Sequence, residues 1–109
     1  MERRYSDFTH EELRQEIAEL TEKAQKAEQL GMVNEFAVHE RKIVMARSYM
    51  LDPNDFKAGE TYEISGDPEH HFYVEYMNGI FAWGYRFLPN KERKSSGEEE
   101  ALPISLLER

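Results

Sequence analysis

Apolar side chains recur at helical spacing through the first third of the chain. A helix is predicted to begin after Thr9, because Thr9 and Glu12 have the spacing of a capping box, in which each side chain accepts a hydrogen bond from the other residue's backbone N–H. Gly31 is well placed to end this helix, since glycine readily adopts the left-handed conformation that follows helix termini. We therefore expect a helix over residues 10–30, with an apolar stripe formed by Leu13, Ile17, Leu20, Ala24 and Ala27.

A second helix is predicted over residues 32–51, where Asp52 and Pro53 end it. Because its apolar positions form two adjacent stripes, one stripe is expected to contact the first helix in an antiparallel hairpin and the other the C-terminal half. The stripes are Met32, Phe36, Ile43 and Met50, and Val33, Ala37, Val44 and Leu51. Glu40 and Arg47 lie on the line between them, where buried charges need partners. An ion pair with the first helix is favoured there over contact with a partner protein, and both stay open.

The apolar period changes from helical spacing to two at about residue 58, which is typical of strands. Asn78-Gly79 between alternating runs is a strong hairpin signal, and Ser65 to Pro68 is predicted as a turn. The expected strands are residues 59–64, 71–77 and 80–87. A charged loop over 89–100, a doubtful edge strand over 101–104 and a terminal helical turn over 105–108 follow.

The predicted hairpin register pairs Met77 with Ile80 and places Tyr73 opposite Gly84. One face of the sheet then carries Phe72, Val74, Tyr76, Phe81, Trp83 and Tyr85, and the other carries Tyr73, Glu75, Ala82, Gly84 and Arg86. The first set is either the core or a groove for a peptide or a base, and the core is favoured, because a small barrel needs its aromatics inside. The groove would be formed by Phe72, Tyr76, Phe81, Trp83 and Tyr85, of which Trp83 and Tyr85 are taken as candidate binding residues. Tyr73, Glu75 and Arg86 are the candidates for external contact.

Composition limits the possible functions. The chain has 109 residues, no cysteine and a net charge of −8. A disulfide framework and a thiolate zinc site are therefore excluded, and no run is long enough for a membrane span. We expect a cytoplasmic protein without a membrane contact. The negative charge disfavours nucleic acid, although a local basic patch could still bind it.

Catalytic patterns are missing from the sequence. It has no glycine-rich phosphate loop and no Gly-x-Ser-x-Gly elbow. Glu69, His70 and His71 suggest a metal site, but adjacent strand residues point to opposite faces, so polar residues opening a strand are favoured. We expect no cofactor, no metal and no enzymatic activity.

Basic residues support an alternative role in nucleic-acid binding. Residues 32–51 are more basic than the first helix, so the second helix can present a modest basic face. The candidate contacts are Arg41, Lys42 and Arg47, with Lys91, Arg93 and Lys94 from the charged loop. The two helices are too long, and their connection too short, for a helix-turn-helix motif.

Several motifs resemble those of the uncharacterised bacterial YfhH family. They are Ala58-Gly-Glu-Thr-Tyr62, Tyr76-Met-Asn-Gly-Ile-Phe-Ala-Trp-Gly-Tyr-Arg86 and Ala101-Leu-Pro-Ile-Ser-Leu-Leu107, with Asn34-Glu35 and Glu40-Arg-Lys-Ile43 in the first half. The resemblance implies an SH3-like barrel that carries an N-terminal helical hairpin, in a family whose members have been labelled as candidate transcriptional regulators. The chain shows three clear strands and one doubtful strand, whereas a small barrel normally has about five.

The predicted fold class is therefore α+β, with a helical hairpin over 1–54 and an SH3-like barrel over 55–109 that share one core. The predicted function is a non-catalytic interaction or regulatory module that binds protein and is linked to transcription through protein contacts. Direct nucleic-acid binding is the alternative, and the sequence leaves the oligomeric state open.

Overall fold

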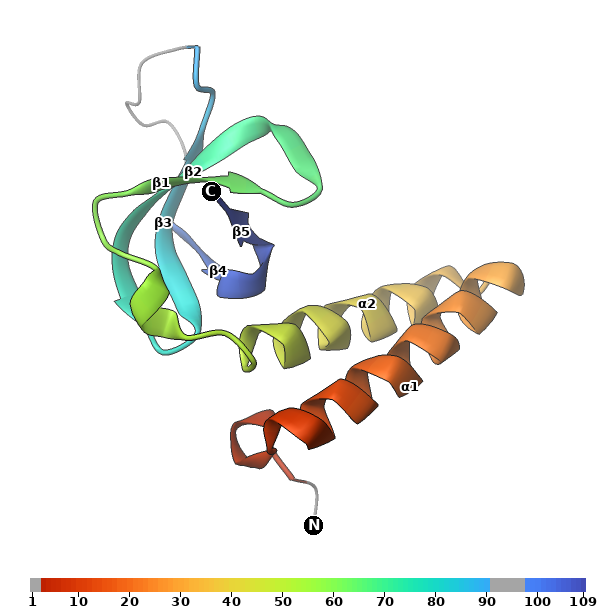
Figure 1. The fold of residues 1–109 in the computed structure, drawn as a ribbon. Coiled ribbons are helices and arrows are strands. Elements are labelled where there is room, and N and C mark those ends of the chain that lie inside the picture. The colour runs from red at the N-terminus through yellow and green to blue at the C-terminus, as the bar shows by residue number, and fades with distance from the viewer. Residues whose placement is uncertain (1–2, 91–97) are drawn as a thin grey trace. The chain divides into compact units, whose positions relative to one another are not determined.

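The chain divides into two compact units. A computed structural model describes residues 3–90 and 98–109, and its units are Met1–Met50 and Leu51–Arg109. The first unit contains the helices α1 (His10–Gln29) and α2 (Val33–Ser48), and the second contains an antiparallel sheet (Figure 1). The α+β class is confirmed. The core shared between the two halves stays a prediction.

Helix α1 begins at the predicted capping box. The backbone N–H of Glu12 donates to the Thr9 hydroxyl at 3.1 Å, and the N–H of Thr9 donates to the Glu12 carboxylate at 2.9 Å. These two bonds satisfy backbone donors that the first helical turn leaves free. The helix buries Leu13, Leu20, Ala24 and Ala27, which are four of the five residues of the predicted stripe.

The turn at Gly31 reverses the chain as predicted. Gly31 has a φ of 72°, and its N–H donates to the carbonyl of Glu28 at 3.1 Å. The N–H of Met32 donates to the carbonyl of Ala27 at 2.8 Å, which completes a Schellman motif. Because this motif ends α1 within two residues, α2 starts at once and runs antiparallel beside it (Figure 1).

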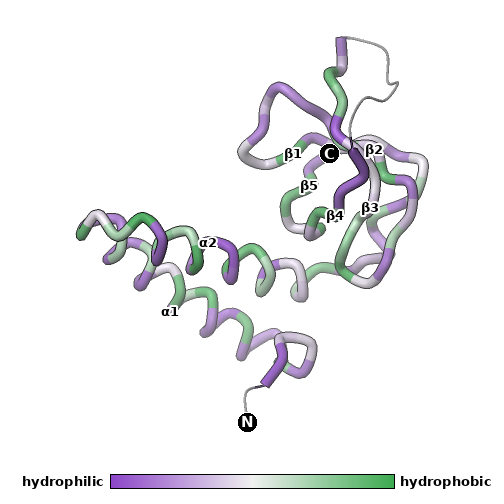
Figure 2. Tube along the Cα trace, turned by 180° about the vertical axis from the view of Figure 1, so that it is seen from behind, coloured by the Kyte–Doolittle hydropathy of each residue, from purple (hydrophilic) through white to green (hydrophobic). Residues whose placement is uncertain are grey.

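A small hydrophobic cluster joins the two helices. Leu20, Ala24 and Ile43 are buried together, with Ile17 and Phe36 packed against them. Hydrophobic and hydrophilic stretches accordingly alternate along both helices in Figure 2. Small alanine side chains at this position allow the helix axes to approach closely.

Most residues of the predicted second stripe of α2 are exposed, and the expected contact of this stripe with the C-terminal half stays a prediction. Val33 is 74% exposed, Ala37 is exposed, and Leu51 is 43% exposed and lies beyond the helix. The helix ends at Ser48, three residues earlier than predicted. After Ser48 the backbone tightens, since the N–H of Met50 donates to the carbonyl of Arg47 at 3.0 Å. Asp52 then accepts the N–H of Asn54 at 2.9 Å and starts a separate 3-10 turn, η2 (Pro53–Asp55).

The second unit is one curled five-stranded antiparallel sheet within the described residues. Its strands are β1 (Thr61–Ile64), β2 (Asp67–Asn78), β3 (Phe81–Phe87), β4 (Glu100–Pro103) and β5 (Leu107–Glu108), in the spatial order β4-β3-β2-β1-β5. A 3-10 helix, η3 (Ile104–Leu106), leads from one edge strand directly to the other, so the sheet must curl (Figure 1). The predicted terminal helical turn is therefore η3 followed by β5, and the doubtful edge strand is confirmed as β4.

The β1–β2 turn is tighter than predicted. It consists of Ser65 and Gly66, and Gly66 has a φ of 83°. Asp67 and Pro68 belong to β2, which begins four residues before the predicted strand. Asp67 pairs with Ile64 in the sheet register, where the turn was predicted to continue.

The β2–β3 turn lies one residue later than predicted, so Met77 pairs with a residue two positions further along β3. Asn78 pairs with Phe81 and Met77 with Ala82, so the turn residues are Gly79 and Ile80. Ile80 is 7% exposed, and its carbonyl accepts the N–H of Ile104 at 3.0 Å. Burial of this apolar side chain thus takes Ile80 out of the strand and into the turn.

A β-bulge at Glu75 changes the faces of the sheet. Val74 pairs with Gly84 and Tyr76 with Trp83, which leaves Glu75 as the extra residue on β2. The predicted faces are therefore wrong for Tyr76 and for all of β3. The inner face carries Phe72, Val74, Met77, Ala82, Gly84 and Arg86, and the outer face carries Tyr73, Tyr76, Phe81, Trp83 and Tyr85.

Gly84 allows the backbones of β2 and β3 to approach closely. The predicted packing of the Tyr73 ring over Gly84 is not formed. Tyr73 pairs with Tyr85, and Gly84 pairs with Val74. A Cβ atom on Gly84 would collide with the backbone carbonyl of Tyr73. Any side chain at position 84 must consequently move the bulged strand.

We expect Gly84→Ala to destabilise the protein by about 1–3 kcal/mol, because the added methyl group can be placed only by shifting backbone. Urea denaturation measures the change in the free energy of unfolding. Thr61→Ala, at an exposed position of β1, is the control and should change it by less than about 0.5 kcal/mol. Equal stability of Gly84→Ala and the wild type would contradict the close approach.

Candidate functional site

The outer face of β2 and β3 carries three cross-strand pairs of rings. We call these six residues the aromatic face, and they are His71, Tyr73, Tyr76, Trp83, Tyr85 and Phe87. The ring centroids lie 5.9 Å apart in the His71–Phe87 pair, 5.4 Å in the Tyr73–Tyr85 pair and 5.9 Å in the Tyr76–Trp83 pair. Such cross-strand pairs stabilise a sheet, and the three pairs follow one another along its outer face.

The Tyr76–Trp83 pair is the most accessible end of this row. Its ring planes are within 4° of parallel, and Tyr76 is 45% exposed. Edge strand β4 places Ala101 beside Trp83 on the same face, so the neighbouring side chain is only a methyl group. The bulge at Glu75 produces this exposure, because it turns Tyr76 from the inner face to the outer face.

Acidic side chains lie next to the exposed pair. Burial and then the charges of Glu99 and Glu75 raise the pKa of the Tyr76 hydroxyl. Both carboxylates are exposed. The negative potential at Tyr76 adds to that of the ring faces, so this end of the aromatic face is suited to hold a cation.

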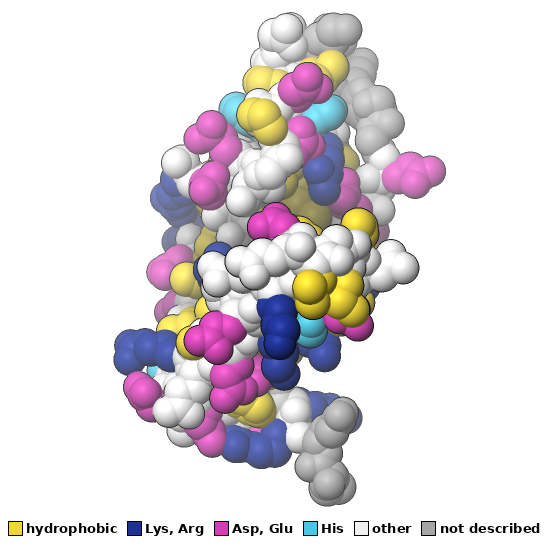
Figure 3. Space-filling model, turned by 90° about the vertical axis from the view of Figure 1, so that its right-hand side faces the viewer, with side chains coloured by type: hydrophobic (Ala, Val, Ile, Leu, Met, Phe, Trp, Pro, Cys, Tyr) yellow, Lys and Arg dark blue, Asp and Glu magenta, His cyan; other side chains and the backbone are white. Residues whose placement is uncertain are grey.

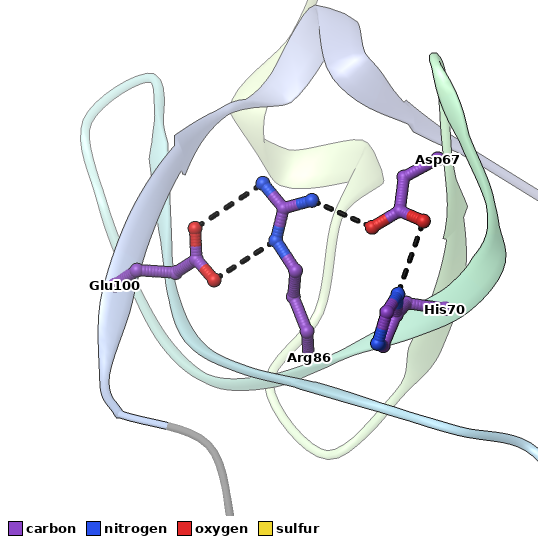
Figure 4. A network of polar contacts seen from close by, with 4 residues as sticks. All are labelled: Asp67, His70, Arg86 and Glu100. Carbon is purple, nitrogen blue, oxygen red and sulfur yellow. Dashed lines mark hydrogen bonds and ion pairs between the residues drawn. The ribbon is translucent and has the colours of Figure 1, made fainter.

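A second polar cluster lies on the inner face of the sheet, as Figure 4 shows. The Arg86 guanidinium donates to both oxygens of Glu100, at 2.9 and 3.3 Å, and to Asp67 at 2.7 Å. The other oxygen of Asp67 lies 3.0 Å from Nδ1 of His70. Arg86 pairs with Phe72 in the register, so this cluster stands beside the core rather than on the outer surface.

The Arg86 cluster is a structural feature, and the predicted role of Arg86 as an external contact does not fit its position. Its guanidinium is occupied by two carboxylates, and its side chain is only 34% exposed. Hydrogen bonds from His70 and then from Arg86 lower the pKa of Asp67, and the bond to Glu100 raises the pKa of Arg86.

Several other predicted site residues are not brought together. Glu40 and Arg47 are exposed and form no ion pair within residues 3–90 and 98–109, so the favoured prediction of an ion pair with the first helix is wrong, whereas contact with a partner protein stays a prediction. The reason is that α2 buries one stripe, through Ile43 and Ala46, and leaves the adjacent line in solvent. Lys91, Arg93 and Lys94 lie outside the described residues.

Basic residues of α2 gather at one cavity of the helical unit. Arg41 and Lys42 line it together with Arg4, and its volume is about 480 Å³. Arg47 is outside it. Acidic and basic side chains are interspersed over the face drawn in Figure 3, which therefore presents no broad basic surface.

The predicted histidine cluster is divided between two environments. His70 faces Asp67, and His71 packs edge-on against Phe87. Among the described residues, no group of three or more His, Asp or Glu side chains could hold a metal ion. No helix in the described parts of the chain is both long and apolar enough to cross a bilayer.

The exposed ring pair was only partly found from the sequence. Tyr73, Glu75, Trp83 and Tyr85 were predicted as binding candidates, and all four lie on the outer side or at the bulge. Tyr76 was placed on the same face as Phe72 and Val74, for which the core was favoured over a groove, because alternation along β2 gives no sign of the extra residue at position 75. A signal was available in Gly84, since a glycine inside a strand often marks a bulge in its partner.

Comparison with known proteins assigns the chain to a family whose function is not known. Residues 3–108 match the family described as "Protein of unknown function (DUF1811)". The chain belongs to this family. It is 54% identical over 108 residues to the uncharacterised protein YfhH of Bacillus subtilis (strain 168), and the match covers 99% of this chain and 97% of that protein. The predicted resemblance to YfhH is confirmed, and the function of this DUF1811 protein must be argued from its surfaces.

The Arg86 cluster predicts a pH dependence of stability. Because the pKa of Asp67 is lowered below its ordinary value of 3.8, its contribution is complete above that value and is lost as the pH falls through the folded-state pKa. Arg86→Gln should destabilise the protein, and the difference from the wild type should be larger at about pH 6 than at about pH 3.

Urea denaturation at both pH values measures this difference. Arg14→Gln is the control, because its ion pair with Glu11 is long, at 3.4 Å, and exposed on both sides, and should contribute little. A loss in Arg86→Gln that does not change with pH would contradict a charged role for the cluster.

Proposed function

We propose that the protein is a non-catalytic binding module whose aromatic face recognises a basic segment of another protein. The observation that carries the proposal is the parallel Tyr76–Trp83 pair beside Glu75 and Glu99, in which Tyr76 is exposed and Trp83 is half-buried. An arginine or lysine side chain placed over these rings would gain a cation–π interaction and face two carboxylates.

The rings of the aromatic face are not needed for the core of the sheet. The inner side already has its own set of buried residues, which are Tyr62, Ile64, Phe72, Val74, Ile80, Ala82, Leu102, Ile104 and Leu107. Large apolar side chains on the opposite side of such a sheet, rimmed by polar groups, are typical of an interaction surface. This supports a binding role for the outer side.

Charge favours a basic peptide over nucleic acid. Aromatic rings on a sheet can stack with bases, but a bound strand would then bring its phosphates close to Glu75 and Glu99. The whole chain has a net charge of −8, which repels phosphate at longer range as well. Both effects reverse sign for a peptide that carries arginine or lysine.

We further propose that the partner is a protein involved in transcription. Basic segments are common on proteins that contact nucleic acid. A cytoplasmic module that covers such a segment would regulate transcription through protein contacts, without touching DNA itself. The strand order and the 3-10 helix between β4 and β5 support the SH3-like barrel that the resemblance implies, a fold class in which peptide binding is common.

Trp83 is the single tryptophan of the chain, so its fluorescence reports on this surface directly. We expect a short peptide of alternating arginine and serine to change the Trp83 emission saturably. The same peptide with glutamate for arginine, and a single-stranded oligothymidylate, should leave it unchanged. Tyr76→Ala should weaken binding of the arginine peptide about three- to tenfold, because one ring of the pair is lost.

Two variants that each remove one carboxylate distinguish the effect of local charge on peptide binding from the effect of the overall charge. Glu75→Gln should weaken binding, whereas Glu19→Gln, which removes an exposed charge from α1, should have a much smaller effect. Thermal unfolding of each variant shows whether the fold is intact. Equal response to the acidic peptide, tighter binding of the oligonucleotide, or a Tyr76→Ala variant that binds as the wild type does would overturn the proposal.

A further inference from the structure

The cavity of the helical unit has features of a site that the aromatic face does not use. It lies between the segment before α1 and the outer side of α2, and its volume of about 480 Å³ is within the range of small-molecule pockets. Three cations line it, namely Arg4, Arg41 and Lys42. Its remaining wall is mostly apolar or aromatic, with Val38, Met45 and the rings of Tyr5 and Tyr49.

The N-terminal wall of the cavity is held in place by several contacts. Arg3 donates to both oxygens of Glu12, at 2.6 and 2.8 Å, and to the carbonyl of Asp7 at 3.0 Å. The Tyr5 hydroxyl donates to Glu16 at 2.8 Å, and its ring packs edge-on against Phe8. These contacts fix the 3-10 helix η1 (Tyr5–Asp7) against α1, so the Tyr5 side chain and the backbone of Arg4 are positioned before any ligand binds.

The three cations lack acidic partners. Arg3, Arg14, Arg86 and Arg109 each form an ion pair with a carboxylate. Within residues 3–90 and 98–109, by contrast, Arg4, Arg41 and Lys42 form none, although the chain has 22 acidic and only 14 basic residues. Three like charges around one cavity repel one another, and a bound anion with more than one negative charge would remove this cost.

We propose that this cavity binds the phosphomonoester of a planar aromatic body, as in a nucleoside monophosphate. The dianionic phosphate would lie among Arg4, Arg41 and Lys42. The planar body would lie against the tyrosine rings and the side chains of Val38 and Met45. The combination of rings and cations is what favours such a ligand over a bare anion, which could not use the apolar wall.

A long nucleic acid fits this site less well than a mononucleotide. Helix α1 carries six glutamates and only three basic residues, so phosphates that extend beyond the cavity toward α1 would be repelled. Arg41 and Lys42, which were candidates for nucleic-acid contact, would thus bind the phosphate of a smaller ligand. The inference concerns the helical unit alone and does not depend on the peptide function of the aromatic face.

Calorimetric titration of the full chain with adenosine monophosphate tests the proposal. We expect saturable binding at least about tenfold tighter than that of adenosine or of inorganic phosphate, because each of these lacks one half of the recognised chemistry. Arg41→Gln combined with Lys42→Gln should weaken binding about tenfold or more. Lys23→Gln combined with Arg47→Gln removes the same charge outside the cavity and should weaken it less than about twofold.

Each other result would overturn the proposal. Equal affinity for adenosine would show that the cations do not contribute, and equal affinity for phosphate would show that the rings do not. An equal loss in the two double variants would reduce the effect to overall charge. Tighter binding of a 5′-phosphorylated oligonucleotide than of adenosine monophosphate would point to nucleic acid instead. Tyr76→Ala should bind adenosine monophosphate as the wild type does, so this test and the peptide test can fail separately.

Discussion

The sheet depends on the close approach of two backbones at Gly84. Because position 84 has no side chain, the bulged segment of β2 can cross it where any other residue would meet the carbonyl of Tyr73. The bulge then decides on which side Tyr76 emerges, and with the Gly79–Ile80 turn it sets the outward direction of Trp83 and Tyr85. One glycine therefore determines both the content of the core and the position of the exposed rings.

Features set by neighbouring residues were predictable from the sequence, and the register of the sheet was not. The capping box at Thr9, the reversal at Gly31 and the change of period near residue 58 each depend on contacts within a few residues. The register depends instead on tertiary burial of Ile80 and on an extra residue at Glu75. The alternation of apolar and polar residues along the strands indicates neither of these features. A one-residue slip inverts every later side chain, so Arg86 and Trp83 exchanged faces.

The same distinction explains what could be predicted of the candidate sites. The types of residue that the two proposed sites use, aromatic rings and cations, are visible in the composition of β3 and of α2. Their grouping is not, because it requires knowing that Arg4 comes beside Arg41 and that Glu99 comes beside Tyr76. The two proposed sites also have opposite charge, so the cationic and anionic ligands proposed for them would bind to different units of a strongly acidic chain.

The position of β5 has a consequence for how the two units form. Helices α1 and α2 meet through residues close in sequence, so a nascent chain can assemble them as soon as both are synthesised. Strand β1 has no second neighbour until Leu107 arrives to pair with Ile64, which leaves its backbone groups open in the meantime. A chain with a folded helical hairpin and an incomplete sheet is prone to aggregation. The unpaired edge of β1 is then a site where another chain could add a strand.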